Sequence, residues 1–337
     1  MPELPEVETI RLQLQPLLKD RLIVDSGSHP SEKFTMSSKA IGHRISQTCR
    51  RGKYLIICLI TESANEKTGD KSVSQDTCGH PHQERELTYT EPDEKDTLQD
   101  ADAAPSEPLN GPLHKLQPGN SPEQNASLRQ VDRELIIHLG MTGRLSLSNE
   151  KQLDHPHLRA WWLLDNETVL AFHDVRRFGR VYFVKAGDYN SIRTLNNIGP
   201  EPFSEQFTAA DFHKAAQSSR RYIKTQLLSQ RLVAGIGNIY ADEALWYAHV
   251  NPVARRLSKT RAETLVDSIR EVLTSALHHK GTTLRDYVTV QGHPGQNQYH
   301  LQCYGRAGKP CNRCATQLRR RVVDGRGTSW CPKCQRY

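Results

Sequence analysis

Apolar residues in the first part of the chain recur with helical spacing and then with the spacing of strands. The helical repeat of three to four residues is followed by Val7, Ile10, Leu14, Leu17 and Leu18. Pro5 suits the first turn of such a helix, and Pro16 should kink or shorten it. Apolar or alternating runs between Gly, Ser and Pro then predict strands at residues 22–24, 40–48, 54–60 and 134–139. A helix followed by a sheet is therefore expected.

Helical spacing returns in the second half of the chain. It predicts helices at residues 208–217, 221–230, 238–248 and 259–279. The run Leu195-Asn196-Asn197-Ile198-Gly199-Pro200 is dense in residues that break regular structure and predicts a domain boundary. We therefore expect a sheet domain at residues 1–195, a helical domain at 196–300 and a small terminal module at 301–337.

Residues 61–130 interrupt the periodic pattern. This stretch is rich in polar residues, Pro and Gly, which predicts a disordered insertion. It holds 14 acidic and 6 basic residues, whereas the whole chain of 337 residues has a net charge of +7. The rest of the chain is therefore strongly basic and suits a polyanionic partner. The acidic tract is either a tolerated surface insertion or a competitor of that polyanion for the basic surface.

Four cysteines near the end of the chain have the spacing of a metal site. The pattern Cys311-x2-Cys314-x16-Cys331-x2-Cys334 is that of a four-cysteine zinc ribbon, and Asp324-Gly325 between the pairs predicts a hairpin turn. This short segment has few apolar residues to form a core, and the metal should therefore supply its folding energy. One structural zinc ion is expected. No apolar run is long enough for a membrane span, and the acidic start is unlike a signal peptide, which favours a cytoplasmic protein.

The first residues carry a candidate nucleophile. Removal of Met1 would leave Pro2 with a free secondary amine, and a terminal amine has an ordinary pKa of about 7.7 to 8.0. Glu3 could position that amine or transfer a proton. Taken alone, the same residues equally describe the start of a helix whose dipole is complemented by Glu6 and Glu8.

The string Pro-Glu-Leu-Pro-Glu-Val-Glu-Thr at residues 2–9 resembles the amino terminus of formamidopyrimidine-DNA glycosylase, a bacterial family that removes oxidised purines and nicks the strand. The resemblance implies that Pro2 is a Schiff-base nucleophile and that Glu3 is a catalytic acid. It also implies that Glu6 supports the site and that Lys53 lies near the catalytic glutamate and the DNA backbone. Leu4 favours the purine branch over the related endonuclease VIII type, which commonly has glycine there.

Other motifs extend the same resemblance. Gly140-Met141-Thr142-Gly143 and the run at residues 172–180 look like the segments that fill the space left by an extruded base, and residues 232–243 look like the helix-two-turn-helix motif of the family. The resemblance assigns the void-filling role to Met141, Arg176 and Phe178, phosphate contacts to Asn238 and Arg326, and a weaker DNA contact to Lys224. Thr282 to Tyr299 resembles a lid over the flipped base.

The predicted protein is of the α+β class. It has an N-terminal β-sandwich with a proline-headed helix, then a helix-two-turn-helix domain and a four-cysteine zinc ribbon. The predicted activity is that of a bifunctional DNA glycosylase and AP lyase, a monomer that acts on double-stranded DNA with oxidised bases or abasic sites and is associated with the nucleoid. The alternatives are a glycosylase for oxidised pyrimidines and a catalytically silent protein that binds damaged DNA.

Overall fold

The computed structural model describes residues 2–61, 131–149 and 153–336, which belong to one compact unit. The predicted insertion at residues 61–130 lies outside the described residues, except that Thr61 is the last residue of a strand.

Helix α1 (Leu4–Leu18) carries the amino terminus. Pro5 lies in its first turn, where a missing N–H costs nothing. Glu3 is the N-cap and forms a reciprocal capping box with Glu6. Pro16 was expected to kink or shorten this helix; it lies inside the helix, which continues through Leu18, whose side chain is fully buried.

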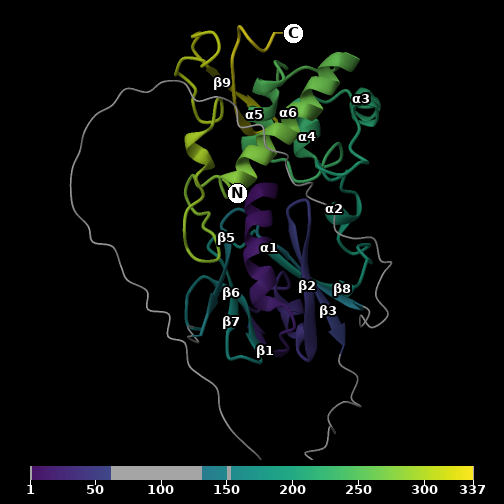
Figure 1. Ribbon diagram of the computed structural model, residues 1–337, viewed down its shortest axis with the longest axis vertical. Coiled ribbons are helices and arrows are strands. Elements are labelled where there is room, and N and C mark those ends of the chain that lie inside the picture. Colours follow the sequence, from purple (N-terminus) through teal and green to yellow (C-terminus); the bar gives the residue numbers. More distant parts are fainter. Residues whose placement is uncertain (1, 62–130, 150–152, 337) are drawn as a thin grey trace, which may run out of the picture. The chain divides into compact units, whose positions relative to one another are not determined.

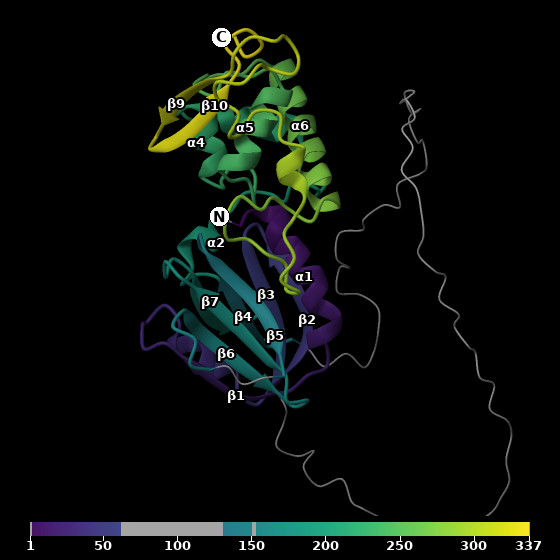
Figure 2. The same cartoon turned by 90° about the vertical axis from the view of Figure 1, so that its left-hand side faces the viewer.

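Two antiparallel four-stranded sheets form the sandwich (Figure 2). One has the order β2-β3-β4-β8, with bounds His43–Arg51, Tyr54–Thr61, Arg133–His138 and Arg180–Lys185. The other has the order β1-β6-β7-β5, with bounds Ile23–Ser28, Leu158–Leu164, Val169–Asp174 and Gly143–Ser148. The apolar face of α1 shares one core with the inward faces of both sheets.

The strand that we predicted at residues 40–48 begins later than expected. A short 3-10 helix, η1 (Thr35–Ala40), precedes it, and Gly42 has a φ of +81°. This left-handed backbone suits glycine and ends the preceding turn, so β2 begins only at His43.

The helical part contains α2 (Arg193–Asn196), α3 (Ala209–Gln217), α4 (Ile223–Leu228), α5 (Asn238–Tyr247) and α6 (Lys259–His278), with the 3-10 helix η3 (Asn297–Tyr299) after them (Figure 1). The long helix α6 is amphipathic and begins at an N-cap, Ser258, whose hydroxyl accepts a hydrogen bond from the amide of Arg261. Its buried face packs on α3 and α5 in a second core. No helix in the described ranges is long and apolar enough to cross a membrane.

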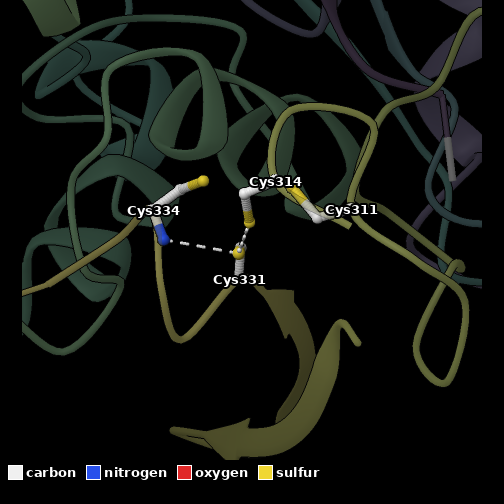
Figure 3. A group of neighbouring side chains, drawn as sticks. All are labelled: Cys311, Cys314, Cys331 and Cys334. Carbon is white, nitrogen blue, oxygen red and sulfur yellow. Dashed lines mark hydrogen bonds between the residues drawn. The ribbon is translucent and has the colours of Figure 1, made fainter. Parts of the chain in front are cut away.

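The terminal module is a hairpin of β9 (Arg319–Val323) and β10 (Arg326–Trp330). The predicted turn is present, with positive φ angles at Asp324 and Gly325. The four cysteines converge beside this hairpin (Figure 3).

Candidate active site

The carboxylate of Glu3 ties the amino terminus to the helical domain. It is 1% exposed, and its two oxygens accept hydrogen bonds from the amides of Gly237, at 2.5 Å, and Ile239, at 3.0 Å. These amides lie at the start of α5, where the helix dipole favours a negative charge. Pro2 is buried next to Glu3. The terminus is therefore held in place by a segment that lies 234 residues further along the chain.

The glycines before α5 make room for this contact. A Cβ atom on Gly237 would lie 2.2 Å from the carboxyl carbon of Glu3, and one on Gly235, where φ is +85°, would lie 2.5 Å from the side chain of Leu4. From the sequence, the amides around these glycines are expected to bind phosphate. In the structure two amides at this helix start bind Glu3 instead.

Glu6 lies behind Glu3 and is buried. Its carboxylate accepts hydrogen bonds from the amides of Glu3 and Thr282, each at 2.7 Å, and from the hydroxyl of Tyr240 at 2.5 Å. Burial and the nearby charge of Glu3 raise its pKa to about 7, against the lowering effect of these bonds. Glu6 thus joins the terminus, α5 and the predicted lid through one titratable group.

A cavity of about 190 Å³ opens in front of Glu3. Its walls come from both domains and from the ribbon, and they include five predicted site residues: Glu3, Lys53, Met141, Asn238 and Arg326. Four further residues that the sequence did not single out complete the lining: Leu228, Ile239, Leu284 and Tyr304. Acid, cations and an apolar side chain therefore meet in one small space.

Lys53 reaches this cavity from the turn between β2 and β3. Gly52 before it has a φ of +57°, which lets the hairpin turn tightly. The side chain of Lys53 is mostly buried, and burial lowers the pKa of its amine; Glu3 and Glu6 oppose this shift, and Arg326 adds to it. The lysine therefore faces both the acidic groups and the arginine of the site.

Lys224 is not where the sequence predicted it. Its side chain is fully buried, and its ammonium lies 2.6 Å from Asp242 and 2.8 Å from the hydroxyl of Thr328. Asp242 also accepts the amide of Ser329 at 2.8 Å. The expectation that Lys224 contacts DNA is therefore corrected, because its ammonium is buried and paired. The lysine instead fastens the β9–β10 hairpin to α4 and α5.

Asn238, at the start of α5, contacts that hairpin next to Arg326, the first residue of β10. The amide of Asn238 donates to the carbonyl of Gly327 at 3.0 Å, next to Arg326, whose side chain is exposed. The N-cap of α5 is Gly237, so Asn238 is the first helical residue rather than the cap. Its Oδ1 is buried and has no hydrogen-bond partner within the described chain, so this oxygen can still accept a hydrogen bond.

Asp174 joins the two predicted void-filling segments. Its buried carboxylate accepts the hydroxyl of Thr142 at 2.5 Å and the amide of Gly179 at 2.7 Å. Arg176 stacks over the ring of Phe178, which is 48% exposed. Met141 lines the cavity, whereas Phe178 lines a neighbouring pocket. The turn with Met141 and the loop with Phe178 are therefore held by one acid that the sequence reasoning missed.

The cysteine site fits zinc. The four sulfur atoms lie within 4.8 Å of one another, and those of Cys314 and Cys331 are 3.5 Å apart (Figure 3). Tetrahedral Zn–S bonds of about 2.3 Å require sulfurs roughly 3.8 Å apart. These cysteines form a structural zinc site, and four thiolates leave no open position for substrate. The core around the site is small and includes Trp246 and Leu318.

Family models match these same parts of the chain. A formamidopyrimidine-DNA glycosylase N-terminal domain matches residues 1–77 and 123–181, and an H2TH domain of the same glycosylase matches residues 198–288. A zinc finger found in FPG and IleRS matches residues 308–336. The formamidopyrimidine-DNA glycosylase of Deinococcus radiodurans is 36% identical, over 99% of this chain and 97% of that protein. The chain belongs to the formamidopyrimidine-DNA glycosylase family.

Solved structures of formamidopyrimidine-DNA glycosylases have the same fold. The MutM (Fpg) protein of Thermus thermophilus superimposes with a TM-score of 0.73 at 35% identity, covering 99% of this chain and 98% of that one. A Lactococcus lactis Fpg mutant in complex with DNA containing Fapy-dG gives a TM-score of 0.72 at 28% identity, with both chains fully covered. The α+β fold with its zinc ribbon is thus confirmed, and the chain is a DNA glycosylase. The domain boundaries at 195/196 and 300/301 stay predictions.

Sequence reasoning missed groups that act through distant partners. Tyr240, Asp242 and Asp174 were not singled out, because the spacing of residues does not show which distant groups they contact. Their importance is visible only in the buried bonds that they form. An acid inside a predicted buried face, such as Asp242 beside Ile239 and Ala241, is the one pattern that could have drawn attention.

Proposed function

We propose that this glycosylase removes oxidised purines from double-stranded DNA and then cleaves the abasic strand, with Pro2 as the nucleophile. The observation that supports this most is the single cavity in which Glu3, Lys53, Asn238 and Arg326 meet. A cationic side chain, an amide side chain and a buried acid in one cavity suit a sugar held between its phosphates. Solved relatives in complex with DNA that contains Fapy-dG or an abasic site agree with this substrate class.

The proposed chemistry begins at the sugar carbon that carries the damaged base. The amine of Pro2 forms a bond to this carbon while the bond to the base breaks, and Glu3 transfers a proton during the exchange. Opening of the sugar ring gives an iminium at Pro2. This electron sink permits loss of a proton from the neighbouring carbon with departure of the 3′ phosphate. Loss of a second proton, from the 4′ carbon, then lets the 5′ phosphate depart. Water finally releases the sugar fragment and restores the amine.

Other side chains have binding roles in this proposal. Lys53, Asn238 and Arg326 hold backbone phosphates around the lesion, and Met141, Arg176 and Phe178 occupy the space left by the flipped base. Leu284 is half exposed and lines the cavity, so residues 282–299 can cover an extruded base. Glu6 supports both Glu3 and this lid through its bonds to Glu3 and Thr282.

Borohydride trapping tests the proposal. Purified protein is incubated with duplexes that carry 8-oxoguanine opposite cytosine, an oxidised pyrimidine, an abasic site or no lesion. We expect a covalent adduct with the 8-oxoguanine and abasic duplexes, mapped to Pro2 by mass spectrometry. An adduct mainly with the pyrimidine duplex would move the substrate to the endonuclease VIII type. Binding without an adduct on any duplex would make the protein a silent DNA binder.

Two variants separate the roles of the first residues. Pro2→Gly replaces the secondary terminal amine by a primary one, so it should slow adduct formation with the 8-oxoguanine duplex, and trapping at the wild-type rate would contradict a specific role of the proline as nucleophile. Glu3→Gln should slow removal of 8-oxoguanine by roughly 10²-fold to 10⁴-fold, the range for general acid catalysis. It should affect the preformed abasic site less, since no base then has to leave. Equal losses on both duplexes would contradict its assignment as the acid for base departure.

We further propose that the enzyme works in the cytoplasm in association with the nucleoid, where its DNA substrate lies. Fluorescence microscopy of a carboxyl-terminal fusion should show signal over the DNA. A signal confined to the cell envelope would contradict this location.

A further inference from the structure

Three ionisable side chains form a row across one sheet, outside the active-site cavity. They are Cys49 in β2, Cys58 in β3 and Glu134 in β4, three strands that lie side by side (Figure 2). Cys58 and Glu134 are directly opposite each other in the strand register. Both cysteines pack in the small cluster on the face of this sheet that is turned away from the sandwich core. None of the three residues lines the active-site cavity.

The two thiols are in contact but differ in their access to solvent. The Sγ atom of Cys58 lies 3.7 Å from that of Cys49 and donates a hydrogen bond to it. Cys58 is 5% exposed, whereas Cys49 is only partly buried. Both are free cysteines. A small solute can therefore reach the sulfur of Cys49, and a second sulfur lies directly behind it.

The surrounding groups make the two thiols chemically unequal. The hydrogen bond from Cys58 and the charge of Arg11 lower the pKa of Cys49, although burial and the carboxylates of Glu134 and Glu8 oppose this shift. The pKa of Cys58 is raised by its bond to Cys49, by burial, and by the nearby charges of Cys49 and Glu134. Cys49 is therefore the sulfur that more readily becomes a thiolate, and Cys58 is the one that keeps its proton.

We propose that Cys49 and Cys58 are a peroxide-reactive dithiol that closes to a reversible disulfide across the β2–β3 hairpin. The Cys49 thiolate attacks one oxygen of hydrogen peroxide, so that an S–O bond forms while the O–O bond breaks and hydroxide leaves. The Cys58 sulfur then attacks the sulfur of the resulting sulfenic acid, and its proton departs with the hydroxyl group as water. The first hydroxide takes a proton from solvent, so two thiols are oxidised while one peroxide is reduced to two waters.

The disulfide encloses the turn that carries Lys53. In the strand register Cys49 is opposite Ile56 and Cys58 is opposite Gln47, so the two cysteines are diagonal neighbours. Diagonal neighbours have Cα atoms about 7 to 8 Å apart, and a disulfide usually joins Cα atoms about 4.4 to 6.8 Å apart. Strands β2 and β3 must therefore shift as the bond forms. The shift reaches Lys53, because the turn that holds this lysine connects the two strands.

Mass spectrometry tests the dithiol directly. Zinc-loaded full-length protein is treated with hydrogen peroxide in small molar excess near neutral pH, and is then unfolded, alkylated and digested. We expect one pair of peptides joined through Cys49 and Cys58, which dithiothreitol separates. Cys303, a buried cysteine in another core, is the internal control and should be alkylated in full. Complete alkylation of both Cys49 and Cys58, or Cys49 joined to a different cysteine, would overturn the proposal.

Two variants separate the two chemical steps. Cys58→Ser keeps a hydroxyl that can donate to Cys49 but has no second sulfur, so Cys49 should stop at the sulfenic acid, which dimedone captures. Cys49→Ser should leave Cys58 as an unmodified thiol, because that thiol is buried. Thermal melting checks that both variants are folded. Cys58→Ser protein without the dimedone adduct at Cys49 would contradict the first step.

Nicking of a duplex with 8-oxoguanine measures the effect on Lys53. The oxidised wild type should nick more slowly, by up to about a hundredfold if the lysine moves by about 1 Å, and dithiothreitol should restore the rate. Cys49→Ser treated with the same peroxide should keep its rate. An equal loss in Cys49→Ser, or an unchanged rate in disulfide-bonded wild type, would overturn the transmission of the shift to Lys53.

The effect on nicking rests on the proposed function, because that function gives Lys53 a phosphate to hold. The two proposals nevertheless fail separately. Reduced wild-type protein that does not nick would end the proposed chemistry, and a mapped disulfide would still support the dithiol. Nicking without any disulfide after peroxide treatment would do the reverse.

Discussion

The two ends of the chain build opposite walls of one cavity by different means. The amino terminus is fixed by protein alone: Glu3 and Glu6 are held by amides and a hydroxyl, and α1 packs on a sandwich core of more than twenty buried residues. The ribbon that carries Arg326 has a core of five buried residues, three of which are cysteines. The two walls serve the same cavity, but their stability comes from different sources. Loss of metal should therefore affect the ribbon wall first.

Loss of a zinc ligand should have the largest effect. Cys331→Ser removes one of the four thiolates, and structural zinc supplies about 10 to 16 kcal/mol of binding energy in small modules. We expect loss of zinc by metal analysis and at least a hundredfold loss of nicking, while circular dichroism still shows a folded sandwich. Cys49→Ser, outside the ribbon in β2, is the control. Zinc-free Cys331→Ser protein with normal nicking would refute the dependence.

Breaking the ion pair between Lys224 and Asp242, beneath the hairpin, should have the second largest effect. Lys224→Met leaves Asp242 buried without its cation, which typically costs about 3 to 5 kcal/mol. Urea unfolding measures this loss. The double variant Lys224→Met/Asp242→Leu should recover much of it, because neither charge is then buried. If Lys224→Met unfolds like the wild type, the pair does not fasten the hairpin.

Glu6 should give the other wall a pH dependence. Its pKa is about 7 in the folded protein against an ordinary value of 4.5, so the folded state binds the proton more tightly. Its contribution to stability is therefore full below about pH 4.5 and is lost as the pH rises through about 7, in total about 3 kcal/mol. The unfolding free energies at pH 5 and pH 8 should differ less in Glu6→Gln than in the wild type, by most of that amount. Equal pH differences in both proteins would exclude Glu6 as the cause.

A crowding variant probes the same wall with a smaller effect. Gly237→Ala places a methyl group 2.2 Å from the Glu3 carboxyl carbon, so the acid must move. A displacement of about 1 Å in an active site costs roughly a hundredfold in rate. Removal of 8-oxoguanine should fall by that factor while DNA affinity changes little. Gly187→Ala is the control: its Cβ meets no atom within 4 Å, and its φ of +77° strains the backbone only at a position outside the cavity wall. Unchanged kinetics in Gly237→Ala would mean that Glu3 is not held where the chemistry needs it.

The local features of this protein could be read from its sequence, and its long-range contacts could not. Helices α5 and α6 were predicted to within a residue, because periodicity reports which face of a segment is buried. The cysteine spacing predicted the metal site for the same local reason. Lys224 was expected at the surface, since nothing near it in sequence announces Asp242 and Thr328. The roles given to Pro2, Glu3 and Arg326 in the reaction stay predictions until the trapping experiment is done.

The bond between Glu3 and the amide of Ile239 also sets an order of events during synthesis. A ribosome that adds about 5 to 20 residues per second needs on the order of 10 to 50 seconds to travel from the first position to the second. Throughout that interval the acid at the start of the chain has no partner at the start of α5. A chain that ends before residue 239 therefore lacks this partner of Glu3 and cannot assemble the cavity.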